Sequence, residues 1–200
     1  MPVSAIFRPD SWVDPLPVQA LFPADHPLEV ELGSGDGSFL AQWAAAHGDR
    51  NFLGVERLLG RLRKLDRKAQ RLGLTNLRLL RIEASYFVSY LLPSRSVSAL
   101  HLYFPDPWPK RKHRKNRLVN AEFATAVSRV LIPGGLLHLR TDDADYFEQM
   151  RSVLDPDPRF RPADPPAELI DAVTDFERQF NSQGIPTRRS SYRLAPPALG

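Results

Sequence analysis

The sequence predicts an α/β fold in which helices cover both faces of a mostly parallel, doubly wound sheet. Short β-rich runs alternate with helical segments between residues 28 and 154. Alternation of this kind is typical of a parallel sheet built from strand–helix units. A last β-rich run at 187–194 follows only a short helix. Strands without a long crossover usually pair antiparallel, so we expect an antiparallel strand at the C-terminal end.

The first half of the pattern predicts two strand–helix units. The runs "LEVEL" and "NFLGVE" are rich in β-forming residues. Apolar residues recur at helical spacing in the segment that follows each run. We expect a strand at 28–32, a helix at 38–47, a strand at 51–56 and a helix at 58–73.

The second half continues the alternation and then becomes irregular. We expect strands at 76–84, 97–104 and 136–142, and helices at 118–131 and 143–154. The sequence "IPGG" should end the first of these helices. The proline-rich segment 155–166 predicts an irregular connector, and a short helix that begins at "TDFE" precedes the last strand.

The length of 200 residues suits one domain, which would bury about 70% of the surface of the unfolded chain. We expect a single domain over residues 1–200, with 1–27 as an N-terminal extension that could be flexible. No apolar run approaches the ~20 residues of a membrane span, and the N-terminus lacks the features of a secretory signal. The absence of cysteine excludes disulfides, thiolate metal sites and a cysteine nucleophile. A cytoplasmic protein without a membrane partner fits these features.

Positive charge is concentrated in two segments, although the net charge is only +4. Arg57 to Arg71 contains seven Lys/Arg residues, and Trp108 to Arg117 contains six. Clustered cations suggest a polyanion partner, usually a nucleic acid. A solvated helix face together with a mobile loop is the alternative, and charge alone favours neither interpretation.

The segment "ELGSGDG" follows the first predicted strand and opens a helix. Gly33, Gly35 and Gly37 permit a tight turn and a close approach of a ligand to the backbone. The following acid, Glu56, ends the second strand 19 residues after Gly37, where a ribose-binding acid belongs. A plain turn is the alternative interpretation of the glycines. The position of the glycine segment between a predicted strand and a predicted helix favours a nucleoside site.

The glycine spacing distinguishes two nucleoside cofactors. A dinucleotide fingerprint G-x-G-x-x-G would need glycine at 38, where the sequence has Ser38. The observed G-x-G-x-G, preceded by Glu31, resembles the first motif of Rossmann-like methyltransferases, which bind S-adenosylmethionine. Glu83 ends the third strand where such enzymes place an acid or amide near the adenine; an ordinary charge at a strand end is the alternative.

The segment "YFPDPWPKRKHRKNR" joins one carboxylate to a run of cations. Pro105, Pro107 and Pro109 restrict the backbone around Asp106 and limit the entropy lost when its carboxylate is aimed. A proline-bounded loop with an incidental acid is the alternative. The glycine loop in the same predicted sheet favours a functional turn, in which we expect Trp108 to pack rather than to stack on a base.

With this segment included, the chain resembles the tRNA (guanine-N7-)-methyltransferase family from about Leu28 to Arg193. The resemblance rests on "ELGSGDGSF", "NFLGVE", "GLTNLRLL", "FPDPWPKRKHRKNRLV", "GGLLHLRTDD" and "TDFERQF". It implies a Rossmann-like class I methyltransferase fold and transfer of a methyl group from S-adenosylmethionine to N7 of guanosine 46 in the variable loop of tRNA. Apart from the resemblance, the sequence offers no metal-ligand spacing, so we expect no metal, and it leaves a monomer or a homodimer open.

The resemblance also implies roles for individual residues. Asp106 is the expected catalytic residue, and it also lies beside the cofactor. The other expected cofactor contacts are Glu31, Gly33, Gly35, Gly37, Glu56 and Glu83. The expected substrate contacts are Lys110, Asp142, Thr174, Asp175, Phe176 and Glu177. Further RNA contacts are expected at Arg111, Lys112, Arg114, Lys115 and Arg117. Thr174 and Glu177 also match a helix capping box, which is compatible with a role at the substrate.

The chemistry of guanine supports the same interpretation without the family. N7 is a lone-pair acceptor on the major-groove edge of the base and carries no proton, so methylation needs no base to deprotonate it. A carboxylate at Asp106 could stabilise the positive charge that develops on the ring, or accept from the N1–H and N2 amino groups. The neighbouring cations would hold the phosphates.

Other functions remain as alternatives at this point. An amino-methyltransferase acting on adenine or cytosine would carry a related Asp/Asn-Pro-Pro-aromatic turn, but here Trp108 directly follows Asp106-Pro107. An NAD-dependent oxidoreductase is disfavoured by Ser38, and a non-catalytic RNA-binding protein would not need the glycine loop and three strand-end acids. The five histidines show no metal-ligand spacing, and His101 and His138 lie within predicted strands, where we expect structural roles.

Overall fold

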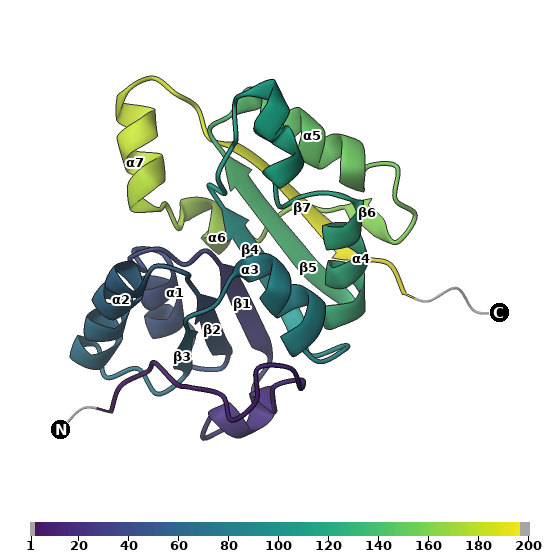
Figure 1. Cartoon of the computed structure of the whole chain (residues 1–200). Helices are drawn as coiled ribbons and strands as arrows, with labels where there is room; N and C mark the ends of the chain where they lie inside the picture. Colours follow the sequence, from purple (N-terminus) through teal and green to yellow (C-terminus); the bar gives the residue numbers. More distant parts are fainter. Residues whose placement is uncertain (1–2, 197–200) are drawn as a thin grey trace.

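The computed structural model describes residues 3–196, which form one seven-stranded sheet with helices on both faces (Figure 1). Across the sheet the strands are β3 (Leu77–Leu80), β2 (Asn51–Val55), β1 (Leu28–Leu32), β4 (Val97–Tyr103), β5 (Leu131–Thr141), β7 (Arg188–Leu194) and β6 (Phe160–Pro162). The first five pair in parallel, whereas β7 pairs antiparallel with both of its neighbours, β5 and β6. This arrangement confirms the predicted fold class.

The direction of the strand order changes between β1 and β4, which lie side by side in the middle of the sheet. The chain runs outward from β1 to β2 and β3, and then returns to β4 and β5 on the other side. Loops after two such strands diverge and leave a crevice beyond their carboxyl ends. Because Leu32 pairs with Leu102, both strands end at the same level and open onto the same crevice.

Two hydrophobic cores lie on opposite faces of the sheet, and alternate residues of a strand point into each. Phe52 belongs to the core under α1 (Leu40–Ala46) and α2 (Leu59–Arg71). The next residue, Leu53, belongs to the core under α4 (Ala121–Val130), α5 (Ala144–Leu154) and a π-helical segment, Phe87–Leu91. The remaining helices are η1 (Val18–Leu21), α3 (Ala84–Tyr86), η3 (Arg111–Asn116), α6 (Ala167–Asp171) and α7 (Asp175–Ser182).

The structure differs from the sequence prediction after β3 and in the proline-rich segment, among other places. The strand expected at 76–84 ends at Leu80, because the Glu83 carboxylate accepts hydrogen bonds from the amides of Ser85 and Tyr86 and starts a helix. The segment 155–166, expected to be irregular, contains the short strand β6, which pairs with β7.

The described part of the N-terminal extension, residues 3–27, packs against the sheet rather than extending freely. The amide of Ala5 donates to Oδ1 of Asp66 on α2 at 2.7 Å, and the amide of Phe7 donates to the carbonyl of Leu79 at 3.1 Å. Leu16 and Val18 are buried in the core. These contacts attach the described part of the extension to the rest of the fold.

His101 and His138 occupy neighbouring positions on β4 and β5, and their rings stack at 5.2 Å. His101 Nε2 lies 2.9 Å from Oε2 of Glu29, and His138 Nδ1 lies 2.8 Å from Oγ of Ser191. Burial, followed by the nearby charge of His101, lowers the pKa of His138 to about 3. Both histidines are buried within the sheet and partnered there, as expected for structural residues.

The structure also bears on membrane association. Among the helices of residues 3–196, none has the length and apolar character needed to cross a bilayer.

Candidate active site

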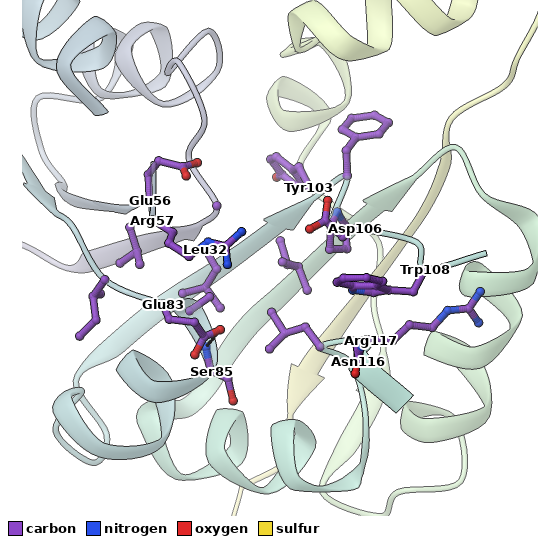
Figure 2. A pocket seen from close by; sticks show the side chains of 18 of the residues that line it. Leu32, Glu56, Arg57, Glu83, Ser85, Tyr103, Asp106, Trp108, Asn116 and Arg117 are labelled. Carbon is purple, nitrogen blue, oxygen red and sulfur yellow. Dashed lines mark hydrogen bonds between the residues drawn. The ribbon is translucent and has the colours of Figure 1, made fainter. Parts of the chain in front are cut away.

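A cleft of about 640 Å³ opens beyond the carboxyl ends of β1, β2 and β4 (Figure 2). Its walls come from segments far apart in the sequence: the glycine loop, the end of β2, the turns after β3 and β4, and the end of the basic segment. The charged lining residues are Glu56, Arg57, Arg61, Glu83, Asp106, Lys115 and Arg117. The fold therefore brings three of the predicted acids to one cavity.

The glycine loop connects β1 to α1 and adopts conformations that favour glycine. Gly35 has φ +55° and Gly37 has φ +73°. A Cβ atom on Gly37 would lie 2.1 Å from Cδ1 of Leu65, so glycine at this position lets α2 pack against the loop. Gly33, at the start of the loop, lines the cleft and has φ +74°.

Glu56 links the glycine loop to the start of α2. Its Oε2 atom accepts from the amide of Gly35 at 3.1 Å, and its Oε1 atom accepts from the amide of Leu58 at 2.7 Å. The residue is 6% exposed. Each carboxylate oxygen has a second lone pair, so this fixed carboxylate can still accept hydrogen bonds from a ligand.

Glu31 lies on β1 next to the glycine loop and is also buried. Its Oε2 atom and the Oγ atom of Ser34 have no hydrogen-bond partner among the described residues. Burial raises the pKa of Glu31 to about 8; the charge of Arg140 opposes this effect, and those of Glu56 and Asp36 add to it. A buried acceptor without a partner is unfavourable, and it fits a site completed by a cationic or hydrogen-bond-donating ligand.

Glu83 forms the wall of the cleft after β3 (Figure 2). Its two oxygens accept from the amides of Ser85 and Tyr86 at 2.9 and 2.8 Å, which fixes the exposed carboxylate at the start of α3. The helix cap and a ligand contact are compatible, because free lone pairs remain.

Asp106 lies on the wall formed by the turn after β4, where its side chain is exposed to the cleft (Figure 2). Two residues of this turn, Phe104 and Trp108, have left-handed φ angles of 51° and 45°. Such angles are unfavourable for large side chains and persist only where the surroundings impose them. The amide of Phe104 donates to the carbonyl of Arg140 at 2.8 Å, and the Nε atom of Arg117 donates to the carbonyl of Pro107 at 2.7 Å.

Comparisons with known proteins match most of this chain. Residues 25–189 match the family model described as "Putative methyltransferase". A tRNA (guanine-N(7)-)-methyltransferase of Halorhodospira halophila is 36% identical over 188 residues, which cover 92% of this chain and 81% of the relative. The chain belongs to the tRNA (guanine-N(7)-)-methyltransferase family. A second member, from Alkalilimnicola ehrlichii, is 34% identical over 92% of this chain and 77% of its own length.

Comparison with solved structures shows that this chain has the fold of class I methyltransferases. A 16S rRNA (adenine(1408)-N(1))-methyltransferase from Catenulisporales acidiphilia, solved with its cosubstrate SAM, superposes with a TM-score of 0.60. The alignment covers 97% of this chain and 94% of that chain at 17% identity. The 16S rRNA methyltransferase KamB gives a TM-score of 0.59 at 18% identity, over 85% of this chain and 88% of its own. At these identities the similarity concerns the fold alone.

The basic segment of this family member extends over Lys110 and the 3₁₀ helix η3. The side chains predicted to contact substrate or RNA are exposed at Lys110, Arg111, Lys112, Arg114 and Lys115. Arg117 is different, because it is 2% exposed and donates to protein groups. The guanidinium of Arg117 is buried under the Asp106 turn, whereas the other predicted cations of this segment are exposed.

The four residues predicted at the start of α7 divide into two pairs. Thr174 and Glu177 form the predicted capping box, and Glu177 is fully buried between Arg140 and Arg189. Asp175 and Phe176 are exposed. The Glu177 carboxylate therefore forms buried ion pairs in this conformation, whereas Asp175 and Phe176 remain accessible.

Helix α7 borders the site from the side of the glycine loop and the Asp106 turn. The amide of Asp175 donates to Oγ of Ser38 at 3.3 Å. The ring centroids of Phe176 and Phe180 lie 6.2 and 5.8 Å from that of Phe104. Lys110, Asp142 and the four residues at the start of α7 lie outside the lining of the cleft itself.

Arg140 is a residue of the site that the sequence interpretation missed. It is 3% exposed, its guanidinium lies 4.4 Å from the ring centroid of Tyr103, and its Nη1 atom lies 2.8 Å from Oε2 of Glu177. Its carbonyl holds Phe104, at the start of the Asp106 turn. Its place in "LRTDD", two residues before the predicted Asp142, is the signal that could have revealed it.

Within residues 3–196, no group of three or more His, Cys, Asp or Glu side chains is arranged to hold a metal ion.

Proposed function

We propose that this chain transfers the methyl group of S-adenosylmethionine to N7 of guanosine 46 in the variable loop of tRNA. The observation that carries the proposal is the position of Asp106, which faces the same cleft as the strand-end acids Glu56 and Glu83 (Figure 2). Membership of the family supports the reaction class.

Two acids that line the cleft and one buried beside the glycine loop fit the polar groups of S-adenosylmethionine. The unpartnered Oε2 of Glu31 could accept from an ammonium group, and Glu56, which already holds Gly35, could accept from the ribose hydroxyls. Glu83 could accept from the adenine amino group. The cofactor supplies an electrophilic methyl group on a sulfonium centre.

Asp106 and its turn supply alignment and charge. Because N7 carries no proton, the chain need only hold the base in line with the methyl group, and alignment of this kind can contribute about 7–11 kcal/mol. Attack by N7 leaves positive charge on the five-membered ring. A carboxylate held at Asp106 stabilises that charge, or orients the base by accepting from N1–H and the N2 amino group.

Positive charge on two sides of the cleft supports a polyanionic substrate. Arg57 and Arg61 line it from the α2 side, and Lys115 lines it from η3. Along α2, the ion pair formed among described residues is Lys68 with Asp36 at 3.8 Å, so most of the cations remain free to contact phosphates.

The test is nucleoside analysis of tRNA after incubation with the protein and labelled S-adenosylmethionine. We expect 7-methylguanosine in a tRNA transcript that has guanosine at position 46, and none when that position is adenosine. Label in methyladenosine or methylcytosine would instead identify an amino-methyltransferase. Retention of tRNA without any label would identify an RNA-binding protein.

A further inference from the structure

Arg117 closes the basic segment but lies inside the protein. All three of its donor nitrogens are engaged: Nε donates to the carbonyl of Pro107 at 2.7 Å, Nη1 to Oε1 of Gln149 at 2.9 Å, and Nη2 to Oδ2 of Asp145 at 2.6 Å. Its guanidinium also lies 4.8 Å from the ring centroid of Tyr146. Three of its five N–H donors are used by protein groups and its side chain is only 1% exposed, so little of the guanidinium is accessible to a phosphate.

The Asp106 turn needs a donor from outside itself. Pro105, Pro107 and Pro109 have no N–H group, so every second residue of the turn lacks a backbone donor. The turn is also strained, since Phe104 and Trp108 have left-handed φ angles. The hydrogen bond from Arg117 reaches the carbonyl of Pro107, the residue directly after Asp106.

The guanidinium of Arg117 also contacts three side chains of α5. Asp145, Tyr146 and Gln149 lie on the first two turns of α5. The side chain of Gln149 donates to the carbonyl of Val119 at 3.1 Å, and the amide of Val119 donates to the hydroxyl of Tyr146 at 3.0 Å. The path from α5 through Arg117 to the turn therefore consists of buried or half-buried contacts.

We infer that Arg117 is a positioning residue that fixes the Asp106 turn to α5, and that it makes no phosphate contact with tRNA. The expected effect on the rate rests on the proposed function, because it assumes that the turn positions Asp106 for methyl transfer. The structural part of the inference concerns only the conformation of the turn.

The kinetic test compares Arg117→Ala and Arg117→Lys with Arg114→Ala. Arg114 is a matched variant, because it is exposed and pairs with the same Asp145 at 3.1 Å without touching the turn. With tRNA and S-adenosylmethionine both saturating, we expect Arg117→Ala to slow single-turnover transfer on the order of 100-fold, as a 1 Å misplacement would. Its tRNA affinity and salt dependence should stay close to wild type. Arg117→Lys should lie between, because one ammonium cannot reach three acceptors.

Arg114→Ala should show the opposite pattern. We expect weaker tRNA binding and a log–log salt slope smaller by about 0.7–0.9, the value expected when one phosphate is no longer neutralised. A reduced salt slope in Arg117→Ala, with an unchanged rate at saturation, would make Arg117 a phosphate-binding residue and overturn the inference while leaving the proposed function intact.

A spectroscopic test requires no activity and separates the inference from the proposed function. The chain has three tryptophans, and 5-fluorotryptophan labelling gives each a fluorine NMR signal, with that of Trp108 assigned by Trp108→Phe. We expect Arg117→Ala and Arg117→Lys to shift or broaden the Trp108 signal while that of Trp43 is retained, which also shows that the variant is folded. Millimolar guanidinium should restore the Trp108 signal of Arg117→Ala. An unchanged Trp108 signal in both variants would refute the inference.

Discussion

Glu56 accepts a hydrogen bond from the backbone amide of Gly35 at 3.1 Å, so the acid at the end of β2 holds the loop that follows β1. We expect Glu56→Ala to weaken binding of S-adenosylmethionine by about 1.5–3 kcal/mol, the range for hydrogen bonds to a charged group. Calorimetric titration measures the change. Glu122→Ala, an exposed position on α4 outside the cleft, is the control and should bind normally.

Gly35→Val should abolish cofactor binding. The residue has φ +55°, a conformation that a β-branched side chain does not tolerate, so the loop must change shape. The same calorimetric titration applies, with thermal unfolding to show that the variant is folded. Normal binding by both Gly35→Val and Glu56→Ala would mean that the cofactor lies elsewhere.

Asp106→Asn should slow methyl transfer severely while leaving tRNA affinity within a few fold of wild type. The substitution keeps the shape and one acceptor oxygen but removes the charge that would stabilise the methylated ring. In single-turnover experiments at saturating substrates, the wild-type rate should be nearly flat from about pH 6 to 9, because N7 has no proton to lose. A log-linear rise through neutral pH that disappears in Asp106→Asn would show that Asp106 is an obligatory base.

Glu31 and Glu29 lie on the same strand, and their substitution should change the free energy of unfolding in opposite directions. Burial raises the pKa of Glu31 to about 8, above its ordinary value of 4.5, so the folded state loses stability as pH rises from 4.5 towards 8. We expect Glu31→Gln to stabilise the free protein by about 1–3 kcal/mol at pH 8 and to weaken binding of S-adenosylmethionine.

Glu29 is the control for that comparison. Burial opposes its ionisation, but hydrogen bonds and charges from His101, Trp43 and Arg50 outweigh this and lower its pKa to about 2. Its contribution is therefore complete above pH 4.5 and is lost as pH falls towards 2. Glu29→Gln should lower the free energy of unfolding at neutral pH. Urea unfolding at several pH values measures both effects, and a loss of stability in Glu31→Gln at pH 8 would contradict the account.

Replacing Arg111, Lys112 and Arg114 with alanine should weaken tRNA binding and leave cofactor affinity unchanged. The log–log salt slope should fall by about 0.7–0.9 for each phosphate that the protein no longer neutralises. We expect a smaller effect from the corresponding triple replacement on α2, at Arg61, Lys64 and Lys68. Filter binding over a range of salt concentrations distinguishes the two surfaces. An unchanged salt slope for either triple variant would show that the residues replaced there make no phosphate contacts.

Glu177→Gln should destabilise the fold more than it affects the substrate. The change leaves Arg140 buried without its ionic partner, and breaking a buried pair in this way typically costs about 3–5 kcal/mol. Asp175→Asn, two residues away and exposed, should change stability by less than about 0.5 kcal/mol. Urea unfolding compares them. A Glu177→Gln variant that keeps wild-type stability but has reduced tRNA affinity would favour a direct substrate contact.

The sequence allowed the central part of the fold to be predicted because local signals and tertiary packing agree there. The alternation of β-rich runs and helical spacing indicated the parallel strands and the helices between them. The glycine loop, Glu56 and the Asp106 turn follow strand ends, and parallel strands bring their carboxyl ends to one edge. The chain order of these motifs was therefore enough to place them in one cleft.

The remaining features depend on contacts that the local sequence does not contain. Arg117 belongs to a run of similar cations, and only its partners on α5, about 30 positions along the chain, bury it. Glu177 matches a surface capping box, yet Arg140 and Arg189 enclose it. The strand β6 lies among prolines, which argue against a strand, and it forms because β7 provides a pairing edge.

The position of β7 has a consequence for synthesis on the ribosome. β7 is the last of the seven described strands in the chain, yet it lies between β5 and β6. Until it emerges, the nascent chain exposes one edge of β5, and β6 has no neighbour to pair with. Arg189, a partner of Glu177, arrives on this same strand. The sheet, the buried charge network and the wall beside the active site should therefore be completed together, and only after β7 has emerged from the ribosome.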